Sequence, residues 1–149
     1  MRVEVDSSGL WGKTSEPTVF GFSDSVDRSI WIAPAVKQAC LQEVRSLRGR
    51  ATVNEYVRLY AIGVFLCLRP HLDRFTEIVL DVEFAGRMDQ VISTLFEQMV
   101  AVDPRHAKIR VRAQRIGKTS RAHAVANGTY RGDRAPDERI ERDQLLELF

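Results

Sequence analysis

Apolar residues repeat along the chain with two different periods, and each period predicts one kind of element. Alternating or continuous apolar runs predict strands, and these runs occupy residues 2–6, 18–23, 29–33, 77–84 and 108–116. Apolar residues at helical spacing predict helices, and these cover residues 34–48, 52–68, 88–102, 120–130 and 143–149. The chain therefore has three successive strands, two helices, and then strands and helices in alternation.

Residues that start and stop elements support these boundaries. Pro34 suits the first turn of a helix, and Gly49 suits the position just after its end. The sequence Thr52-Val-Asn-Glu55 matches the capping box that opens many helices. Either Thr119 or Ser120 can cap the helix that follows the last predicted strand.

The order of the elements predicts an α/β fold. Three strands in a meander, followed by two further strands that alternate with helices, predict a mixed sheet of about five strands flanked by helices. A chain of 149 residues is long enough to bury one sizeable core. We therefore expect a single domain that spans residues 1–149.

Composition narrows the class of protein without naming a function. Hydrophobic residues make up 44% of the chain and charged residues 28%, as in ordinary globular proteins, and the net charge of +2 gives no argument for nucleic-acid binding. Cys40 and Cys67 lie in apolar helical patterns without metal-type spacing, so we expect buried, reduced thiols. The charged first residues do not resemble a signal peptide, and no apolar run is long enough to span a membrane. These features predict a cytoplasmic protein without a membrane partner.

The predicted strand at 77–84 carries the clearest chemical signal. Asp81 interrupts an aliphatic run that is typical of a buried strand, and Glu83 follows on the same face. A carboxylate at the end of a buried strand needs a cation, a hydrogen-bond network or a catalytic role. Asp6 ends the strand 2–6 in the same way. If these two strands are parallel neighbours, their carboxylates meet at one edge of the sheet, where they favour a divalent cation.

The order of the elements, with Asp6 on the first strand and Asp81 at the end of the fourth, resembles the ribonuclease H-like superfamily of nucleases and resolvases. The run Asn54–Leu68 followed by Ile78-Val-Leu-Asp81 is similar in layout to the core helix and strand of that superfamily. The resemblance covers roughly residues 1–131. The helix at 34–48 is an addition to the usual layout.

The resemblance implies a reaction, a cofactor and partners. It implies hydrolysis of phosphodiester bonds in nucleic acid, either an RNA–DNA hybrid or branched DNA, with Mg²⁺ or Mn²⁺ held by carboxylates in a two-metal mechanism. It also admits a homodimer, because two-fold dimers are common among the junction-cutting members. The alternative is a nucleic-acid-binding or assembly module on the same fold, without catalysis.

The resemblance also implies a set of site residues. A third acid lies near the start of the helix before the fourth strand, which here is Glu55, and a fourth group comes from the last core helix, which here is His123. The predicted catalytic residues are therefore Asp6, Glu55, Asp81 and His123, and the predicted metal ligands are Asp6, Glu55, Asp81 and Glu83. Asp133 and Asp137 are alternative fourth ligands, since the final core helix contains no Asp.

Each of these residues also has a structural interpretation. Asp6 could accept hydrogen bonds from the amides of the turn that follows it. Glu55 could serve only as the capping-box partner of Thr52. Glu83 could pair with Arg87, and His123 could pack or cap. Asp81 has the weakest structural interpretation, because a buried strand rarely ends in an unpaired acid.

Basic residues gather around the last predicted strand and the start of the following helix. We expect four of them to contact phosphates, namely Arg110, Arg112, Lys118 and Arg121. The alternative is a solvated basic edge strand that deters aggregation. Trp11 and Trp31 are candidates for stacking on bases, although Trp31, in a predicted strand, is expected in the core. His71 and His106 fall in predicted loops and carry no functional signal.

One stretch resembles a nucleotide-binding loop and is rejected. The sequence Ser7–Thr14 ends like a phosphate-binding P-loop. Its first glycine is replaced by Ser7, and Pro17 and a strand pattern follow where the motif requires a helix. We therefore do not expect a nucleoside triphosphatase.

Overall fold

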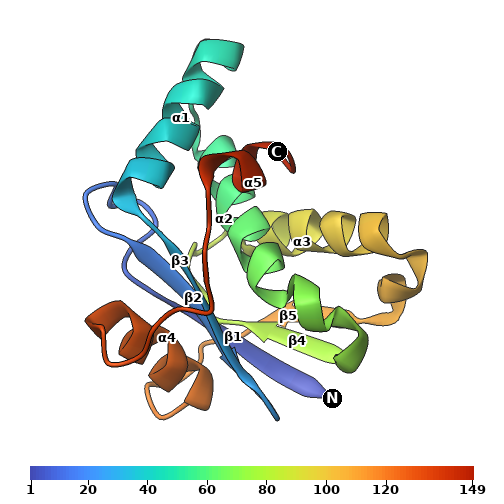
Figure 1. Ribbon diagram of the computed structural model, residues 1–149. Coiled ribbons are helices and arrows are strands. Elements are labelled where there is room, and N and C mark those ends of the chain that lie inside the picture. Colours follow the sequence, from blue (N-terminus) through green and yellow to red (C-terminus); the bar gives the residue numbers. More distant parts are fainter.

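A six-stranded mixed sheet forms the centre of the protein, for which a computed structural model describes all residues from Met1 to Phe149 (Figure 1). Its strands lie in the order β5-β4-β1-β2-β3-β6. Their bounds are β1 Arg2–Ser8, β2 Thr18–Ser23, β3 Asp27–Ile32, β4 Glu77–Leu80, β5 Arg110–Ala113 and β6 Glu138–Arg139. The predicted α/β class and the meander followed by two further strands are thus present.

The central strand β1 brings distant parts of the chain together. It pairs antiparallel with β2, where Asp6 lies opposite Gly21, and parallel with β4, where Val5 lies opposite Leu80. The Asp81 N–H continues this ladder by donating to the Val5 carbonyl oxygen at 3.1 Å. Because Asp6 and Asp81 directly follow this pair of neighbours, both carboxylates lie at the same edge of the sheet.

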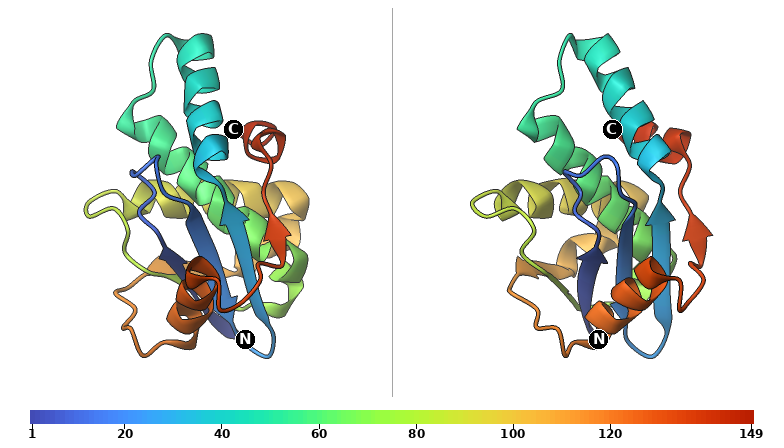
Figure 2. Two further views of the ribbon diagram at one scale, coloured as in Figure 1. Left: turned by 60° about the vertical axis from the view of Figure 1, so that its left-hand side comes forward. Right: turned by 90° about the vertical axis from the view of Figure 1, so that its left-hand side faces the viewer.

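Helices cover both faces of the sheet. Their bounds are α1 Pro34–Arg48, α2 Val53–Leu68, α3 Met88–Val102, α4 Arg121–Arg131 and α5 Arg142–Leu146, with 3-10 turns at Arg69–Arg74 and Pro104–Lys108. Figures 1 and 2 show α4 alone on one face and α2 and α3 on the other, with α1 projecting away from the sheet. None of the helices combines the length and the apolar character that crossing a membrane would need.

The position of α4 depends on a glycine in β2. A Cβ atom at Gly21 would lie only 2.9 Å from the backbone nitrogen of Ala126, so only glycine lets the helix lie this close to the sheet. Ala126 is itself fully buried at this contact. The close approach brings the first turn of α4 down onto β1.

The core lies between the sheet and α2. Ile30, Ile32 and Ile78 fill the sheet side, and the helix is buried along almost its whole length, as its continuous apolar sequence predicts. Cys40 and Cys67 are buried and free, in agreement with the prediction of reduced thiols.

Two predictions about the sheet need correction. The sheet has six strands rather than about five, because residues 138–139 form β6 beside β3. A two-residue strand is too short to give a hydrophobic period, and it is held by the Asp137 carboxylate, which accepts a hydrogen bond from the Ser29 N–H at 2.8 Å. The predicted strands at 77–84 and 108–116 shorten to 77–80 and 110–113, so Glu83 lies beyond the end of β4.

Candidate acidic site at the ends of β1 and β4

Asp6 is the most buried acid of the chain, with 5% of its surface exposed. Its Oδ1 accepts a hydrogen bond from the Ser7 N–H at 2.8 Å, and its Oδ2 lies 2.9 Å from Nδ1 of His123. Burial raises the pKa of Asp6, and the charge of Asp81 raises it further, while the bonds from Ser7 and His123 act in the opposite direction. The turn interpretation is therefore correct in part, because the turn amide uses only one carboxylate oxygen and the other contacts His123.

His123 reaches Asp6 because the first turn of α4 is fixed at two points. The Ser120 hydroxyl caps the helix by accepting from the Ala122 N–H at 3.1 Å, and it also donates to the Glu4 carboxylate at 3.2 Å. His123 lies one turn later, beside the next residue of β1 on the same face. Its side chain is 28% exposed, and Nδ1 is the ring nitrogen in its contact with Asp6, so Nε2 is left for solvent or a ligand.

Asp81 lies directly after β4 and fixes the loop that leads into α4. Its Oδ1 accepts a hydrogen bond from the Ile116 N–H at 2.7 Å. It is close enough to Asp6 and to Glu83 for its charge to raise the pKa of both. The structure thus brings together the two acids that the sequence places on neighbouring strands.

Glu83 joins the same group from the segment after β4. Burial raises the pKa of Glu83, with further increases from the charges of Asp81 and Asp6. Its carboxylate accepts hydrogen bonds from the Trp11 backbone N–H and from the Ser7 hydroxyl, the latter at 3.5 Å. It does not pair with Arg87, which binds Asn54 instead. We call Asp6, Asp81 and Glu83 the acidic cluster.

The structure does not bring Glu55 to the acidic cluster. It lies at the start of α2, where its carboxylate accepts from the Thr52 backbone N–H at 2.8 Å and from the Thr52 hydroxyl, and it faces Arg48 at 4.0 Å. These contacts, first that with the Thr52 hydroxyl, lower the pKa of Glu55. The capping-box interpretation therefore accounts for this residue.

Tyr60 is the residue of α2 that reaches the acidic cluster. Its hydroxyl lies 3.4 Å from the Ser7 hydroxyl, and burial raises its pKa strongly, followed by the charge of Glu83. Sequence reasoning missed this residue, because a tyrosine within an apolar helix is typical of a core position. Its ring is in fact packed edge-on against Phe20 and Phe84.

Lys37 is a second residue that the sequence analysis missed. Only 2% of its surface is exposed, and its ammonium donates to the carbonyl oxygens of Leu10 and Lys13, at 3.3 and 2.7 Å, and to the Thr18 hydroxyl at 3.1 Å. Burial lowers its pKa to about 8, although the charges of Glu16 and Glu83 oppose this change. Lys37 therefore fixes the loop that carries Trp11 to Glu83. The helical period could have predicted that Lys37 is buried, because it lies on the same face of α1 as Cys40, Leu41 and Val44.

The predicted phosphate-binding residues divide into two pairs. Arg110 and Arg112 on β5 are partly neutralised by Glu77 on β4, at 3.4 and 3.3 Å. Lys118 and Arg121, at the start of α4, are exposed and form no ion pair. The second pair is thus available to an anion beside His123, and the first pair is consistent with the edge-strand interpretation.

The alternative fourth ligands lie away from the acidic cluster. Asp137 binds the Ser29 N–H and Arg134, and Asp133 lies in the exposed turn after α4. His123 is the only residue of α4 that contacts a member of the acidic cluster through a hydrogen bond.

The acidic cluster was tested for its fit to a metal ion. No three His, Cys, Asp or Glu side chains lie close enough together to form a metal-binding group by themselves. None of the three carboxylates forms an ion pair with Arg or Lys, and His123 is the only basic side chain within salt-bridge distance of them. Mg²⁺ is usually held by one or two carboxylates, with water and substrate phosphates as the other ligands. The carboxylate oxygens, which have no Arg or Lys partner, fit that form of binding. They do not fit a site in which protein side chains supply all the ligands.

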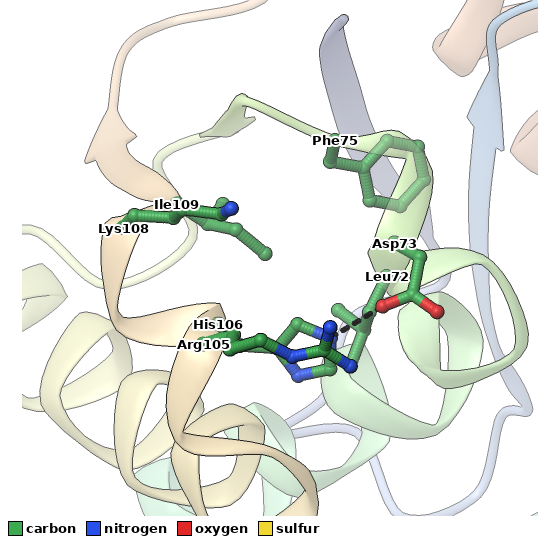
Figure 3. Close-up of a pocket in the computed structure, with 7 residues that line it drawn as sticks. All are labelled: Leu72, Asp73, Phe75, Arg105, His106, Lys108 and Ile109. Carbon is green, nitrogen blue, oxygen red and sulfur yellow. Dashed lines mark hydrogen bonds and ion pairs between the residues drawn. The ribbon is translucent and has the colours of Figure 1, made fainter.

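A separate cavity lies at the opposite edge of the sheet, where β4 and β5 begin (Figure 3). It has a volume of about 240 Å³. His106, which carried no signal in the sequence, is buried beside it and uses both ring nitrogens, Nδ1 at 3.0 Å from the Met99 carbonyl oxygen and Nε2 at 2.9 Å from Asp73. Since both partners are acceptors, this geometry favours the doubly protonated ring.

Comparison with known proteins gives no identification. No family model matches the chain, and neither a curated protein nor a solved structure matches it.

Proposed function

We propose that the protein is a metal-dependent nuclease with a ribonuclease H-like fold, which hydrolyses phosphodiester bonds in nucleic acid. One observation carries the proposal: Asp6 and Asp81 directly follow the paired residues Val5 and Leu80 of the parallel strands β1 and β4, and His123 from α4 is bound to Asp6. The sheet order β5-β4-β1-β2-β3 and the placement of α4 beside β1 support the fold. The sixth strand and the helix α1 are additions to this arrangement.

Mg²⁺ or Mn²⁺ would be held by Asp6 and Asp81, with Glu83 as a further ligand. Bound there, the metal would polarise the scissile phosphate and activate a water molecule. The raised pKa values of Asp6 and Glu83 support this assignment, because burial and repulsion among carboxylates are relieved when a cation binds between them.

His123 would transfer protons in the reaction. With Nδ1–H donating to Asp6, its Nε2 is the nitrogen that can accept or donate a proton at the substrate. The Asp6 carboxylate would hold the ring in one orientation, as a carboxylate does for a catalytic histidine in other hydrolases. Lys118 and Arg121 would contact the phosphates of the bound strand from the start of α4.

The acid expected from α2 is the main departure from the superfamily. The residue of α2 that reaches the site is Tyr60, whose hydroxyl lies beside the Ser7 hydroxyl. The Glu83 carboxylate, from the segment after β4, accepts a hydrogen bond from the same Ser7 hydroxyl. We propose that Glu83 supplies the third acid that Glu55 was expected to supply.

The test is a cleavage assay with purified protein on labelled RNA–DNA hybrid, branched DNA and single strands, with Mg²⁺ or Mn²⁺ present. We expect one of these substrates to be cut, and the Asp81→Asn variant to lose the activity while keeping its circular dichroism spectrum. Glu55→Gln is the matched control, since it removes an acid outside the acidic cluster and should retain activity. Equal activity of wild type and Asp81→Asn would contradict the proposal.

A second candidate function is a nucleic-acid-binding module without catalysis. The observation that favours it is that no three metal-ligating side chains gather at the site. In that case the protein binds nucleic acid equally well with or without Mg²⁺ and cuts none of the substrates in the same panel. The expected homodimer stays a prediction, which sedimentation at several concentrations would test.

A further inference from the structure

A second pocket lies on the α4 face of the sheet, at the C-terminal end of α4, whereas His123, which contacts Asp6, lies in the first turn of that helix. Its volume is about 330 Å³, within the range of pockets that hold small ligands. Trp31 from β3, Tyr130 and Arg131 from the end of α4, Arg134 from the loop that follows, and Arg139 from β6 contribute to its lining. Aromatic rings and three arginines thus come together from four segments of the chain.

The two tryptophans exchange the roles that the sequence suggested. Trp11 is buried, with 3% exposed, and its indole N–H donates to the Tyr56 carbonyl oxygen at 2.9 Å. Trp31 is only partly buried, because Ile30 and Ile32 occupy the core face of β3 and Trp31 points to the other face. Of the two, Trp31 is therefore the indole that a ligand can reach.

Two of the three arginines around Trp31 form no ion pair. The Arg139 guanidinium lies over the indole, 5.2 Å from its centre, and neither Arg139 nor Arg131 forms an ion pair. Arg134 is held by Asp27 and Asp137, so it shapes the wall of the pocket. Two free guanidiniums beside an accessible aromatic ring are the combination that holds a phosphate and stacks a base.

The pocket and Asp6 share one face of the sheet and one helix, α4. Asp6 pairs with Gly21 across β1 and β2, and Gly21 pairs with Ser29, so Trp31, two residues further along β3, points to the face of Asp6. Along α4, Tyr130 lies seven positions after His123, which corresponds to a rise of about 10 Å. That distance corresponds to about three stacked nucleotides at roughly 3.4 Å each.

We propose that this pocket binds an unpaired nucleotide of a single-stranded nucleic acid, with the base against Trp31 and the phosphate against Arg131 and Arg139. The inference deepens the proposed function, because the strand held here would continue past α4 to the acidic cluster. An acidic peptide is the less favoured occupant, since carboxylates would use the arginines and leave the indole without a stacking partner.

The test measures binding of a fluorescein-labelled single strand of about 10 nucleotides by anisotropy, with EDTA present so that no metal-dependent cleavage occurs. We expect Trp31→Ala to weaken binding at least about fivefold, with Trp31→Phe retaining most of the affinity because a ring remains. Arg131→Ala and Arg139→Ala should each weaken binding and lower its salt dependence by about one released ion. Arg45→Ala, which removes an exposed charge from α1, is the matched control and should bind like the wild type.

Two results would overturn the inference. One is unchanged affinity in the Trp31→Ala variant, and the other is displacement of the oligonucleotide by a poly-glutamate peptide at equal concentration. The outcome is separable from the nuclease proposal. If binding depends on Trp31 but no substrate is cleaved in Mg²⁺, the nucleotide pocket is supported and the nuclease proposal is refuted. If a substrate is cleaved but Trp31→Ala binds it as well as the wild type does, the nuclease proposal is supported and the nucleotide pocket is refuted.

Discussion

His123 and Asp6 are joined at 2.9 Å although 116 residues separate them in the sequence, and this contact connects α4 to the central strand of the sheet. Asp6 therefore has one oxygen committed to a histidine and the other to the Ser7 N–H. The pairing gives the buried carboxylate a partly exposed neighbour that can exchange protons with a substrate.

Replacement of His123 by Asn is expected to lower the rate of cleavage by about 10²–10⁴, the usual contribution of a positioned acid or base. The fold should persist, because Gly21 and Ser120 still hold α4 against the sheet. The measurement is the single-turnover rate with saturating substrate, compared with the melting temperature of the same variant. A rate within about twofold of the wild type would exclude His123 as a catalytic residue.

Replacement of Glu83 by Gln is expected to stabilise the protein near neutral pH at the expense of activity. The pKa of Glu83 is raised in the folded protein, so the folded state favours the protonated acid. The wild type therefore loses stability as the pH rises from the unfolded pKa of Glu83 through its folded pKa. The Gln variant has no carboxyl group at this position and keeps that stability. Urea unfolding in EDTA at pH 4 and pH 8, with Glu43→Gln on α1 as the control, would show this difference.

For Glu83 the opposite result is equally informative. A Gln variant that is less stable than the wild type at pH 8 would mean that the hydrogen bonds from Ser7 and Trp11 outweigh the burial and repulsion of the charge.

Replacement of Lys37 by Met is expected to destabilise the protein by about 1–3 kcal/mol, because buried oxygen acceptors in the loop after β1 lose their donor. The loop should also become more mobile and lose the Trp11 contact with Glu83. Hydrogen exchange of the loop amides and the free energy of unfolding measure the two effects. Lys13→Met is the control, since Lys13 is exposed and should change stability by less than about 0.5 kcal/mol.

Replacement of His106 by Gln is expected to flatten the dependence of stability on pH. Burial lowers the pKa of His106, but the hydrogen bonds to Asp73 and Met99 and the charges of Asp73 and Asp103 outweigh it and raise the net value above 6.5. The stabilisation is thus complete below the unfolded pKa and is lost as the pH rises through the folded pKa. Melting temperatures between pH 5 and pH 9 measure this loss.

The matched variant for His106 is His71→Gln, which removes a histidine whose ring packs against Phe22 and forms no ion pair. If both variants keep the slope of the wild type, the pair of His106 and Asp73 does not control stability.

The sequence located the two central acids because strand periodicity is a strong local signal. The alternation before Asp6 and the aliphatic run before Asp81 predicted two strands that end at these acids, and parallel pairing brings the acids together although β1 continues to Ser8. The same period could have placed Trp31 outside the core, since Ile30 and Ile32 already define the inner face of that strand. What the pattern could not predict was the short strand β6, which is held beside β3 by tertiary contacts such as that of the Asp137 carboxylate with the Ser29 N–H.

Glu55 and Tyr60 show where sequence reasoning ends. The pattern Thr52-x-x-Glu55 fits both a capping box and a displaced catalytic acid, and only the direction of α2 relative to β1 separates the two. Tyr60 lies in an apolar run that predicts a core position, and its ring is indeed in the core. Its hydroxyl reaches the acidic cluster only because tertiary packing places Ser7 beside it.

The central claim is that the acidic cluster holds a divalent cation. The most direct measurement is an anomalous difference map from crystals soaked in Mn²⁺, for the wild type and for Asp81→Asn. We predict a manganese peak within about 2–2.5 Å of carboxylate oxygens of Asp6 and Asp81 in the wild type, and its loss in the variant. A map without a peak at these carboxylates, or a peak that persists in Asp81→Asn, would contradict the account.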